Sequence, residues 1–571
     1  MMHRADKLVR LRRTLLLFCI PLLSAPGLSA QAKPSEGLGP IRSYISNGWN
    51  VLTRSMTQCD SVKDPKLAAP AVLYLPAGFS IPPAVEKLQA DCKVEVKHLP
   101  QEIHRPGEID VSKISPHGLL YLEKSYVVPG GRFNEMYGWD SYFTLLGLLR
   151  DGRLDLARNI VDNFLFEIQY YGTVLNANRT YYLTRSQPPF LTSMVWDVYR
   201  AQKAAGHEDR AWLERAYESA SHDYEMWVRE PHLAGDTGLS RYYDFGDGPV
   251  AEGLQDETGY YRTVATFFYT HPELAAGELI ETRPDQANPE AVGFSFSLQV
   301  CESTTDGQKC DPFRTLSLTR DFYKGDRSMR ESGFDVSFRF GPHGDRTHHF
   351  APVCLNSLLY KTETDLEQMS QFLGKKEDAA KWRQRAEDRK QRMNKYLWDE
   401  QKGLFFDYDV DKQQRSTYEY ITTFYPLWAG LATPDQARAL LKNLSSFEQA
   451  GGLAMSRTEP GTQWDYPYAW APTQIIAVTG LRRYGFKSDA DRIAYKFLSM
   501  IAENFRRDGT IREKYNAVTR SSETHVTAGY HANVVGFGWT NGAFLEILHD
   551  LPPSDVERLA KEQNAPAAEA K

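Results

Sequence analysis

Cysteine is scarce in this sequence, and the spacings that accompany the common metal motifs are missing. The chain has 571 residues and only six Cys. No C-x-x-C pair or His cluster has the spacing of a zinc site. The nearest candidate is residues 343–350 (HGDRTHHF), which we interpret as a solvated loop. We therefore expect no bound metal.

Long apolar runs are also missing, except near the N-terminus. There a basic stretch (RLRR, 10–13) precedes an apolar stretch (14–30), and AQA (30–32) supplies small residues at cleavage spacing. Pro21 and Pro26 interrupt the apolar stretch, which is shorter than the ~20 residues that a membrane-spanning helix needs. We predict a signal peptide over residues 1–32, a periplasmic or secreted protein, and no membrane association after its removal.

An excess of positive charge is missing as well. The formal net charge is −6 at pH 7, although the first 30 residues carry five Lys or Arg and one Asp. The remainder is therefore more negative still, which argues against nucleic acid and anionic lipid as partners. Cys19 would leave with the signal peptide. In an oxidising compartment the remaining cysteines would allow a disulfide between Cys301 and Cys310, with Cys59–Cys92 as a second candidate.

Helical patterns dominate what is present, and they come in pairs. Each pair has one strongly apolar member and one amphipathic member, as expected for an inner ring of buried helices and an outer ring that faces water. An α-solenoid is the alternative, but no fixed repeat period is visible. The pairs cover residues 140–152 with 153–172, 188–206 with 209–230, 353–374 with 375–399, 418–432 with 433–446, and 472–485 with 488–508, and a last helix covers 540–551.

The pairs predict an all-α fold, a helical toroid, with one long interruption. Residues 238–333 are turn-rich with short β-like runs, and we interpret them as a partly ordered insertion over one face of the toroid. We divide the rest into an N-terminal extension packed on the toroid (33–104), a catalytic domain (105–552) and a loose C-terminal tail (553–571). We expect the protein to be a monomer.

One stretch, PGGRFNEMYGWDSY (129–142), gathers two adjacent glycines, an arginine, two acids and four aromatic residues. A polyhydroxylated, uncharged ligand is bound by flat apolar faces ringed by fixed hydrogen-bonding groups. The stretch therefore indicates a binding site for a small sugar.

Two long motifs carry a family resemblance. PGGRFNEMYGWDSY is similar to the first signature of the family 37 glycosidases, the trehalases, and QWDYPYAWAP (463–472) is similar to the second. NANRTYYLTRSQPP (176–189), ESGFD (331–335), REKY (512–515) and GFGWTNG (536–542) also resemble stretches of that family. The resemblance implies an (α/α)6 toroid that hydrolyses the disaccharide α,α-trehalose to two glucoses with inversion, without a metal or organic cofactor.

Hydrolysis of a glycosidic bond needs a protonated carboxyl group on the leaving oxygen and an ionised one that activates water. The candidates are Asp335 and Glu513, each in a loop between helical segments. By resemblance Asp335 is the general acid and Glu513 the general base. For an arbitrary acidic residue an N-cap or ion pair would be the better interpretation, but the surrounding motifs favour catalysis.

The remaining site candidates are sugar-binding groups. Arg132, Arg185 and Gln187 offer fixed hydrogen-bond donors, although Arg185 could instead form a structural ion pair. Asn176 and Asp140 suit contacts to hydroxyl pairs, and Tyr137 would orient the site. Phe133, Trp139 and Trp470 would supply apolar walls, with Trp139 equally suited to the core. Gly333 precedes the acid within ESGFD.

Two stretches depart from the family's pattern. Where the family has RPES, this chain has PVAEG (249–253), which keeps Glu252 but has Val250 in place of the arginine. The family's glycine-rich lid corresponds to residues 524–535, which lack a clear match to the lid glutamate. We expect either that Tyr530 and His531 replace its contact, with Gly529 bending the loop, or that the loop stands clear of the ligand.

Three alternatives to a trehalase stay open at this point. The first is a glycosidase of the same fold that acts on another α-glucoside. The second is a catalytically inactive sugar-binding protein, against which both carboxyls argue. The third is a phosphorylase, which would lack the base Glu513.

Overall fold

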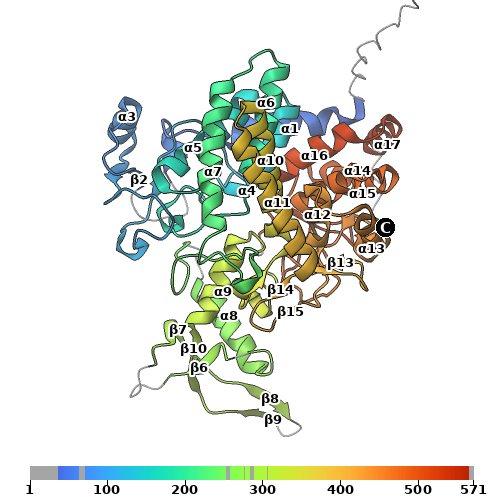
Figure 1. The fold of residues 1–571 in the computed structure, drawn as a ribbon. Coiled ribbons are helices and arrows are strands. Elements are labelled where there is room, and N and C mark those ends of the chain that lie inside the picture. Colours follow the sequence, from blue (N-terminus) through green and yellow to red (C-terminus); the bar gives the residue numbers. More distant parts are fainter. Residues whose placement is uncertain are drawn as a thin grey trace, which may run out of the picture.

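The computed structural model describes residues 36–63, 71–252, 257–275, 277–282, 288–304, 307–530 and 532–564. Six helices form a closed inner ring in which each packs against the next, and the last packs against the first. They confirm the predicted (α/α)6 toroid (Figure 1). In ring order they are α4 (Gly138–Arg150), α6 (Leu191–Ala204), α10 (Val353–Leu373), α12 (Tyr425–Ala429), α14 (Ala471–Arg483) and α16 (Gly538–Asp550).

The outer helices follow the inner ones along the chain and bury one face each. A sixth outer helix comes from the N-terminal extension, where α1 (Gly39–Leu52) packs against α16. Ile41, Ile45 and Trp49 recur every four residues along α1 and are all buried, so α1 has the single apolar stripe of an amphipathic helix. The others are α5 (Leu154–Tyr171), α7 (Arg210–Trp227), α11 (Lys376–Tyr396), α13 (Pro434–Asn443) and α15 (Lys487–Asp508).

Two glycines let the first and last inner helices close the ring. A Cβ on Gly147 of α4 would lie 2.4 Å from Gly542 Cα of α16. A Cβ on Gly542 would lie 2.1 Å from the Phe143 carbonyl oxygen. Any larger residue at either position would force the two backbones apart.

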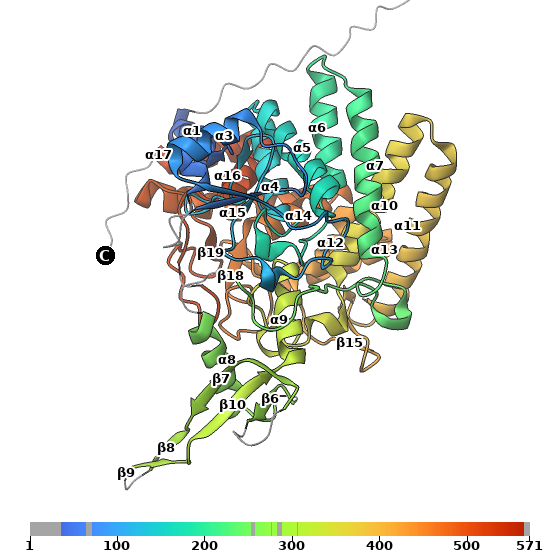
Figure 2. The same ribbon diagram turned by 90° about the vertical axis from the view of Figure 1, so that its left-hand side faces the viewer.

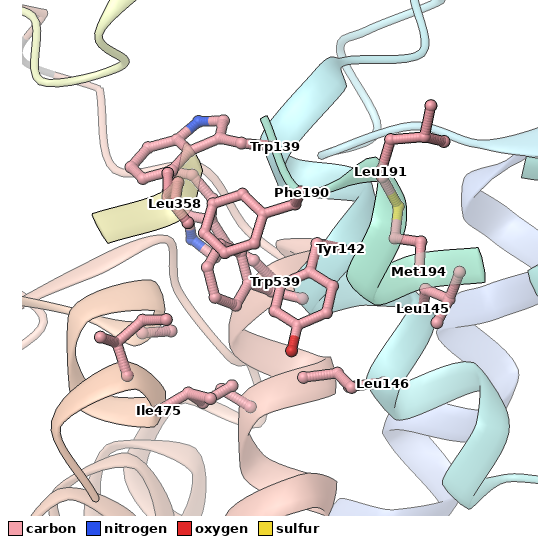
Figure 3. Close-up of a cluster of buried hydrophobic side chains, with 14 of the residues drawn as sticks. Trp139, Tyr142, Leu145, Leu146, Phe190, Leu191, Met194, Leu358, Ile475 and Trp539 are labelled. Carbon is pink, nitrogen blue, oxygen red and sulfur yellow. The ribbon is translucent and has the colours of Figure 1, made fainter. Parts of the chain in front are cut away.

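Aromatic side chains fill the centre of the ring (Figure 3). Tyr142 of α4 stacks on Phe190, with centroids 4.7 Å apart. Trp139 and Trp539 meet edge to face in the same cluster, at 5.7 Å. The cluster packs helices from opposite ends of the sequence into one core.

The N-terminal extension has a small sheet of its own. Its strands are all parallel, in the order β3 (Glu95–His98), β2 (Val72–Leu75), β4 (Leu119–Leu120). Cys59 in α2 (Cys59–Val62) and Cys92 at the end of α3 (Pro83–Cys92) form the disulfide that the sequence predicts as a second candidate. The predicted signal peptide, residues 1–32, lies outside the described residues.

Short antiparallel strand pairs connect the loops over the toroid. The pair β18–β19 matters for the site, because it places Trp470 opposite Lys514. The pairs are β1 (Thr53–Arg54) with β5 (Tyr126–Val127), β12 (Trp398–Asp399) with β13 (Leu404–Phe405), β16 (Glu448–Gln449) with β17 (Gly452–Leu453), and β18 (Tyr468–Trp470) with β19 (Lys514–Asn516). Strand β14 (Tyr408–Asp409) pairs with both β11 (Phe350–Ala351) and β15 (Gln414–Arg415).

The insertion is a lobe that projects from the toroid (Figures 1 and 2). Helix α8 (Glu257–Thr270) packs on an antiparallel sheet of β6 (Leu279–Glu281), β10 (Arg314–Thr319) and β7 (Ala291–Leu298). Phe268, Phe296 and Leu318 lie in a core separate from that of the toroid. The lobe then leads directly into α9 (Arg320–Glu331).

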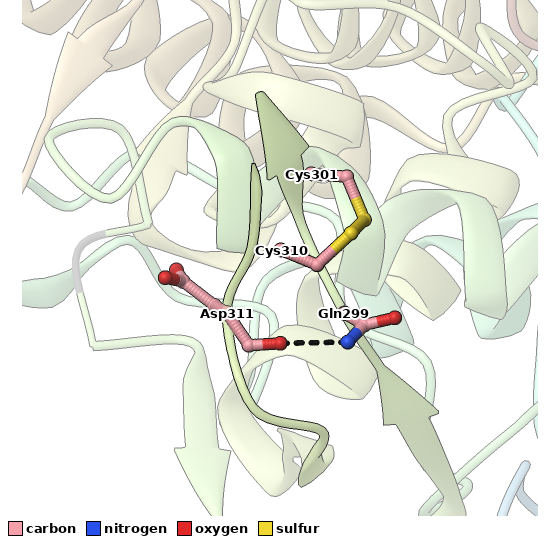
Figure 4. The surroundings of a disulfide bond; sticks show 4 residues. All are labelled: Gln299, Cys301, Cys310 and Asp311. Carbon is pink, nitrogen blue, oxygen red and sulfur yellow. Dashed lines mark hydrogen bonds between the residues drawn. A yellow bond between two sulfur atoms is a disulfide. The ribbon is translucent and has the colours of Figure 1, made fainter. Parts of the chain in front are cut away.

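The predicted disulfide between Cys301 and Cys310 lies at the tip of the lobe (Figure 4). It joins β8 (Cys301–Thr304) to β9 (Gly307–Cys310), where the two cysteines face each other. At the base of this hairpin, Gln299 Nε2 donates a 2.7 Å hydrogen bond to the Asp311 carbonyl oxygen.

The expectation of a turn-rich, partly ordered insertion is wrong for α8 and α9. The α8 segment, ETGYYRTVATFFYT, is rich in aromatic and β-branched residues, which by themselves favour strand. Its helix is stabilised by packing on the sheet rather than by local preference.

The expectation of a loose tail from residue 553 is also wrong, up to Asn564. Residues Pro553–Asn564 form α17, which buries Leu559 and Ala560.

Candidate active site

The loops at one end of the toroid enclose a cavity of about 380 Å³. Thirteen of the residues predicted from the sequence line it, and they come from segments spread over almost 400 residues. These are Arg132, Phe133, Tyr137, Trp139, Asp140, Asn176, Arg185, Gln187, Glu252, Gly333, Asp335, Glu513 and Tyr530.

Among the described residues, one that the sequence predicts for the site, Trp470, does not line the cavity. Trp470 is fully buried and stacks face to face on Trp464, at 3.9 Å and 7°. Trp464 lines the cavity in its place, so Trp470 supports that wall from behind. Trp470 is held behind the wall because it lies in β18 and its indole Nε1 donates a 2.8 Å hydrogen bond to the Gln463 carbonyl oxygen. His531 lies outside the described residues.

Asp335 lies in the loop that follows α9. Gly333 has a φ of +75°, and a Cβ there would lie 2.8 Å from the Trp139 ring. Glycine thus lets the chain turn tightly over the indole before it reaches the acid. Burial raises the pKa of Asp335 to about 7, against the opposing charge of Arg330. A carboxyl group with this pKa is protonated below neutral pH and can donate its proton.

Glu513 lies in the loop before β19. Its Oε1 accepts a hydrogen bond from the Tyr530 hydroxyl, while no described residue donates to its buried Oε2. Burial raises the pKa of Glu513, whereas Lys514, the Tyr530 hydroxyl and Arg132 lower it. The last three interactions favour the ionised form, and the unpaired Oε2 is free to accept a proton from water.

A third carboxyl group stands near both of these. Asp140 is in the first turn of α4 and is buried. Burial raises its pKa well above the ordinary value, and the charges of Glu513 and Asp335 raise it further. Burial and these two charges all favour the protonated form of Asp140, which can donate as well as accept hydrogen bonds.

A buried network of charges forms one wall of the cavity. Glu252 bonds Arg185 on one side and Arg330, at 3.1 Å, on the other. Although burial raises the pKa of Glu252, the two arginines bring it below its ordinary value. Arg185 also donates to Asn176 Oδ1 at 3.1 Å. Arg185 thus forms ion pairs and lines the cavity at the same time.

The sequence analysis did not identify Arg330 and Trp464 as site residues, although one is next to a recognised motif and the other is within one. Arg330 immediately precedes ESGFD, and Trp464 is the second residue of QWDYPYAWAP. Arg330 is at the end of α9 and forms an ion pair with Asp326 one turn earlier, at 3.2 Å. Val250, which stands where the family has arginine, is buried.

The loop expected to act as a lid reaches the cavity through Tyr530. Gly529 has a φ of +113°, and a Cβ there would lie 2.6 Å from Gln463 Cδ. The predicted bend at Gly529 is therefore required, both by its backbone conformation and by its contact with Gln463. Arg132 stacks on the Tyr530 ring, with its guanidinium carbon 5.4 Å from the centroid.

Fold and site together define a toroid of paired helices whose loops hold several carboxyl groups in a cavity walled by aromatic rings and arginines. The family model described as "Trehalase" matches residues 76–277 and 298–552. The chain belongs to the trehalase family. The two matched ranges are separated by residues 278–297, which include β6 and most of β7 of the lobe.

Individual relatives agree with this assignment. A "Cytosolic neutral trehalase" of Emericella nidulans is 40% identical over 467 residues, covering 75% of this chain and 57% of the relative. One of Saccharomyces cerevisiae is 35% identical over 558 residues, covering 87% and 69%. This chain thus spans about 57–69% of the length of these relatives. The structure titled "Neutral trehalase Nth1 from Saccharomyces cerevisiae" superposes with a TM-score of 0.73 at 31% identity, covering 92% of this chain and 96% of that one.

The names of the relatives contradict the expectation of a periplasmic or secreted protein. The relatives from Emericella nidulans, Saccharomyces cerevisiae and Neurospora crassa are named as cytosolic enzymes. The prediction of export was drawn from N-terminal composition alone, and we do not retain it. In the described part of the chain, no helix combines the length and apolarity required to cross a membrane.

Proposed function

We propose that this protein hydrolyses α,α-trehalose to two molecules of glucose with inversion at the attacked carbon. The observation that carries the proposal is the presence of Asp335 and Glu513 in one cavity with different surroundings. Asp335 has a pKa raised to about 7, whereas Glu513 is next to the cations Lys514 and Arg132. This difference supports Asp335 as the acid and Glu513 as the base. The names of the relatives supply the substrate.

In the proposed reaction Asp335 transfers its proton to the oxygen that joins the two sugars. Glu513 removes a proton from a water molecule as that water attacks the anomeric carbon from the opposite face. The bond between the anomeric carbon and the bridging oxygen breaks. Asp335 has then lost one proton and Glu513 has gained one. Arg185, Glu252 and Asn176 would hold sugar hydroxyls, and Trp464 and Trp139 would pack against the apolar ring faces.

The direct test is glucose release from trehalose by the purified protein, compared with a panel of other α-glucosides such as maltose. Trehalose should be the best substrate, and Asp335→Asn should release no glucose from any member. A faster reaction on another α-glucoside would replace the proposed substrate but keep the mechanism. Saturable binding of trehalose with no turnover by the wild-type protein would instead indicate a sugar-binding protein.

Inversion has its own test. Proton NMR during the first minutes should show α- and β-glucose in equal amounts, because inversion changes only the attacked sugar. Pure α-glucose would show retention, which uses a nucleophilic carboxyl about 5 Å from the acid instead of a base about 6.5–9.5 Å away.

A further inference from the structure

A second cluster of ionisable groups lies where the lobe joins the toroid. His348 Nε2 is 3.0 Å from Asp321 Oδ1, and His349 Nε2 is 3.2 Å from Asp321 Oδ2. These donor atoms all lie within 4.8 Å of one another. None of the three residues lines the catalytic cavity.

The local fold explains how the three side chains meet. Asp321 is in the first turn of α9, directly after the last strand of the lobe. His348 and His349 end a short 3-10 turn, Thr347–His349, that packs against α9. The solvated loop expected for residues 343–350 is therefore wrong, because α9 covers it and His343 and His348 are buried.

The surroundings of His349 match those of a metal ligand. His349 Nδ1 is 2.7 Å from Asp411 Oδ2, and a ligating histidine commonly donates its other ring N–H to such a carboxylate. Asp321 is half-exposed, at 48%, which leaves a path for an ion.

We propose that Asp321, His348 and His349 form a binding site for a divalent transition metal, with Zn²⁺ as the best fit, and that Asp411 orients His349. Two imidazoles and one carboxylate are a donor set that Zn²⁺ accepts, with water in the fourth position of the tetrahedron. Zn–N and Zn–O bonds of about 2.0–2.2 Å place such donors ~3.3 Å apart. The two separations between histidine and Asp321, 3.0 and 3.2 Å, are close to this value.

The site would join two segments of the molecule. His348 and His349 lie in the turn Thr347–His349, whereas Asp321 begins the helix whose far end carries Arg330 and leads to Asp335. A bound ion would therefore fix this turn to α9. Its role is structural, because the catalytic carboxyl groups lie at the other end of that helix.

The test uses untagged full-length protein that has been treated with EDTA and desalted. Isothermal titration with Zn²⁺, together with metal analysis after gel filtration, should give one ion per chain. The double substitution His348→Asn with His349→Asn should weaken binding at least 100-fold. Asp411→Asn should weaken it about 10–100-fold, as expected for an outer carboxylate. His207→Asn, at an exposed histidine elsewhere, is the matched control and should bind as the wild type does.

Two further measurements separate this site from the catalytic one and from misfolding. Co²⁺ in place of Zn²⁺ should give the intense visible absorption of four-coordinate cobalt in the wild type and in Glu513→Gln alike. If the double variant fails to fold by circular dichroism, Asp321→Asn and Asp411→Asn decide instead. Absence of stoichiometric Zn²⁺ binding by the wild type, or equal binding by the folded variants, would show that the cluster is held by hydrogen bonds alone.

Discussion

Lys514 Nζ donates a 2.9 Å hydrogen bond to Gln463 Oε1, and both side chains are buried. The Gln463 amide in turn donates to the carbonyl oxygen of Asp335, and Lys514 follows Glu513 in sequence. One bridge of two side chains therefore connects the loop that carries the acid to the loop that carries the base.

Breaking this bridge should reduce catalysis without removing either carboxyl group. We expect Gln463→Ala to lower kcat about 100-fold, because a displacement of about 1 Å can have an effect of that size. KM should change less. Steady-state kinetics on trehalose measures both. Gln89→Ala, at an exposed glutamine, is the control, and unchanged kcat in Gln463→Ala would show that the loops hold their positions without the bridge.

Substitution of either catalytic carboxyl group should nearly abolish hydrolysis. Asp335→Asn removes the proton donor and Glu513→Gln removes the base. The kcat of each variant should therefore fall about 100–10,000-fold, while the variant folds normally. Asp91→Asn and Glu86→Gln, at exposed positions, are the matched controls. Near-normal turnover by either site variant would remove that residue from its role.

The pH dependence should be bell-shaped, with its alkaline limb near neutrality. Asp335 must be protonated to act, and its pKa is raised to about 7 by burial. Activity should therefore fall as the pH rises through about 7. The acid limb should follow Glu513, which must be ionised. A profile of kcat/KM against pH tests this, and undiminished activity at pH 9 would contradict Asp335 as the proton donor.

Removal of the Tyr530 hydroxyl should shift the acid limb. The hydroxyl donates to Glu513 Oε1 and so lowers the pKa of that carboxyl group. In Tyr530→Phe the pKa of Glu513 should rise, and the acid limb should move to higher pH while the alkaline limb stays in place. Tyr466→Phe, also in a loop of this face, is the control. An unmoved acid limb would mean that the hydrogen bond does not hold the base in its ionised form.

Asp335→Asn should make the folded protein more stable at neutral pH. In the unfolded chain this carboxyl ionises near pH 3.9, whereas in the folded protein its pKa is about 7. The wild type therefore loses stability as the pH rises from about 4 to about 7, and the variant does not. We expect a difference of about 1–2 kcal/mol in the free energy of unfolding at pH 8, below the limit of ~1.4 kcal/mol per pH unit, because the carboxyl faces the cavity. Urea unfolding at pH 4.5 and pH 8 measures it, and a difference independent of pH would refute the linkage.

The sequence alone was enough to predict the ring of helices, because a buried inner helix and an amphipathic outer helix have different residue patterns. The long motifs likewise predicted which segments form the cavity. Both kinds of prediction depend on local patterns. Local patterns could not tell which of Trp464 and Trp470 faces the cavity, because both lie in one motif and their rings stack on each other. Only the packing of β18 against the core decides which ring faces the cavity.

Tertiary structure also decided the features for which local preference points the wrong way. The aromatic and β-branched residues of α8 favour strand, and burial against the lobe's sheet makes them helical. His348 and His349 are in a polar stretch that indicates a solvated loop, yet α9 covers it and brings Asp321 to both rings. Periodicity thus predicted the toroid, and the motifs predicted the loops that form its cavity. Contacts between segments distant in sequence determined the lobe, the wall of the cavity and the histidine cluster, because burial outweighs local preference.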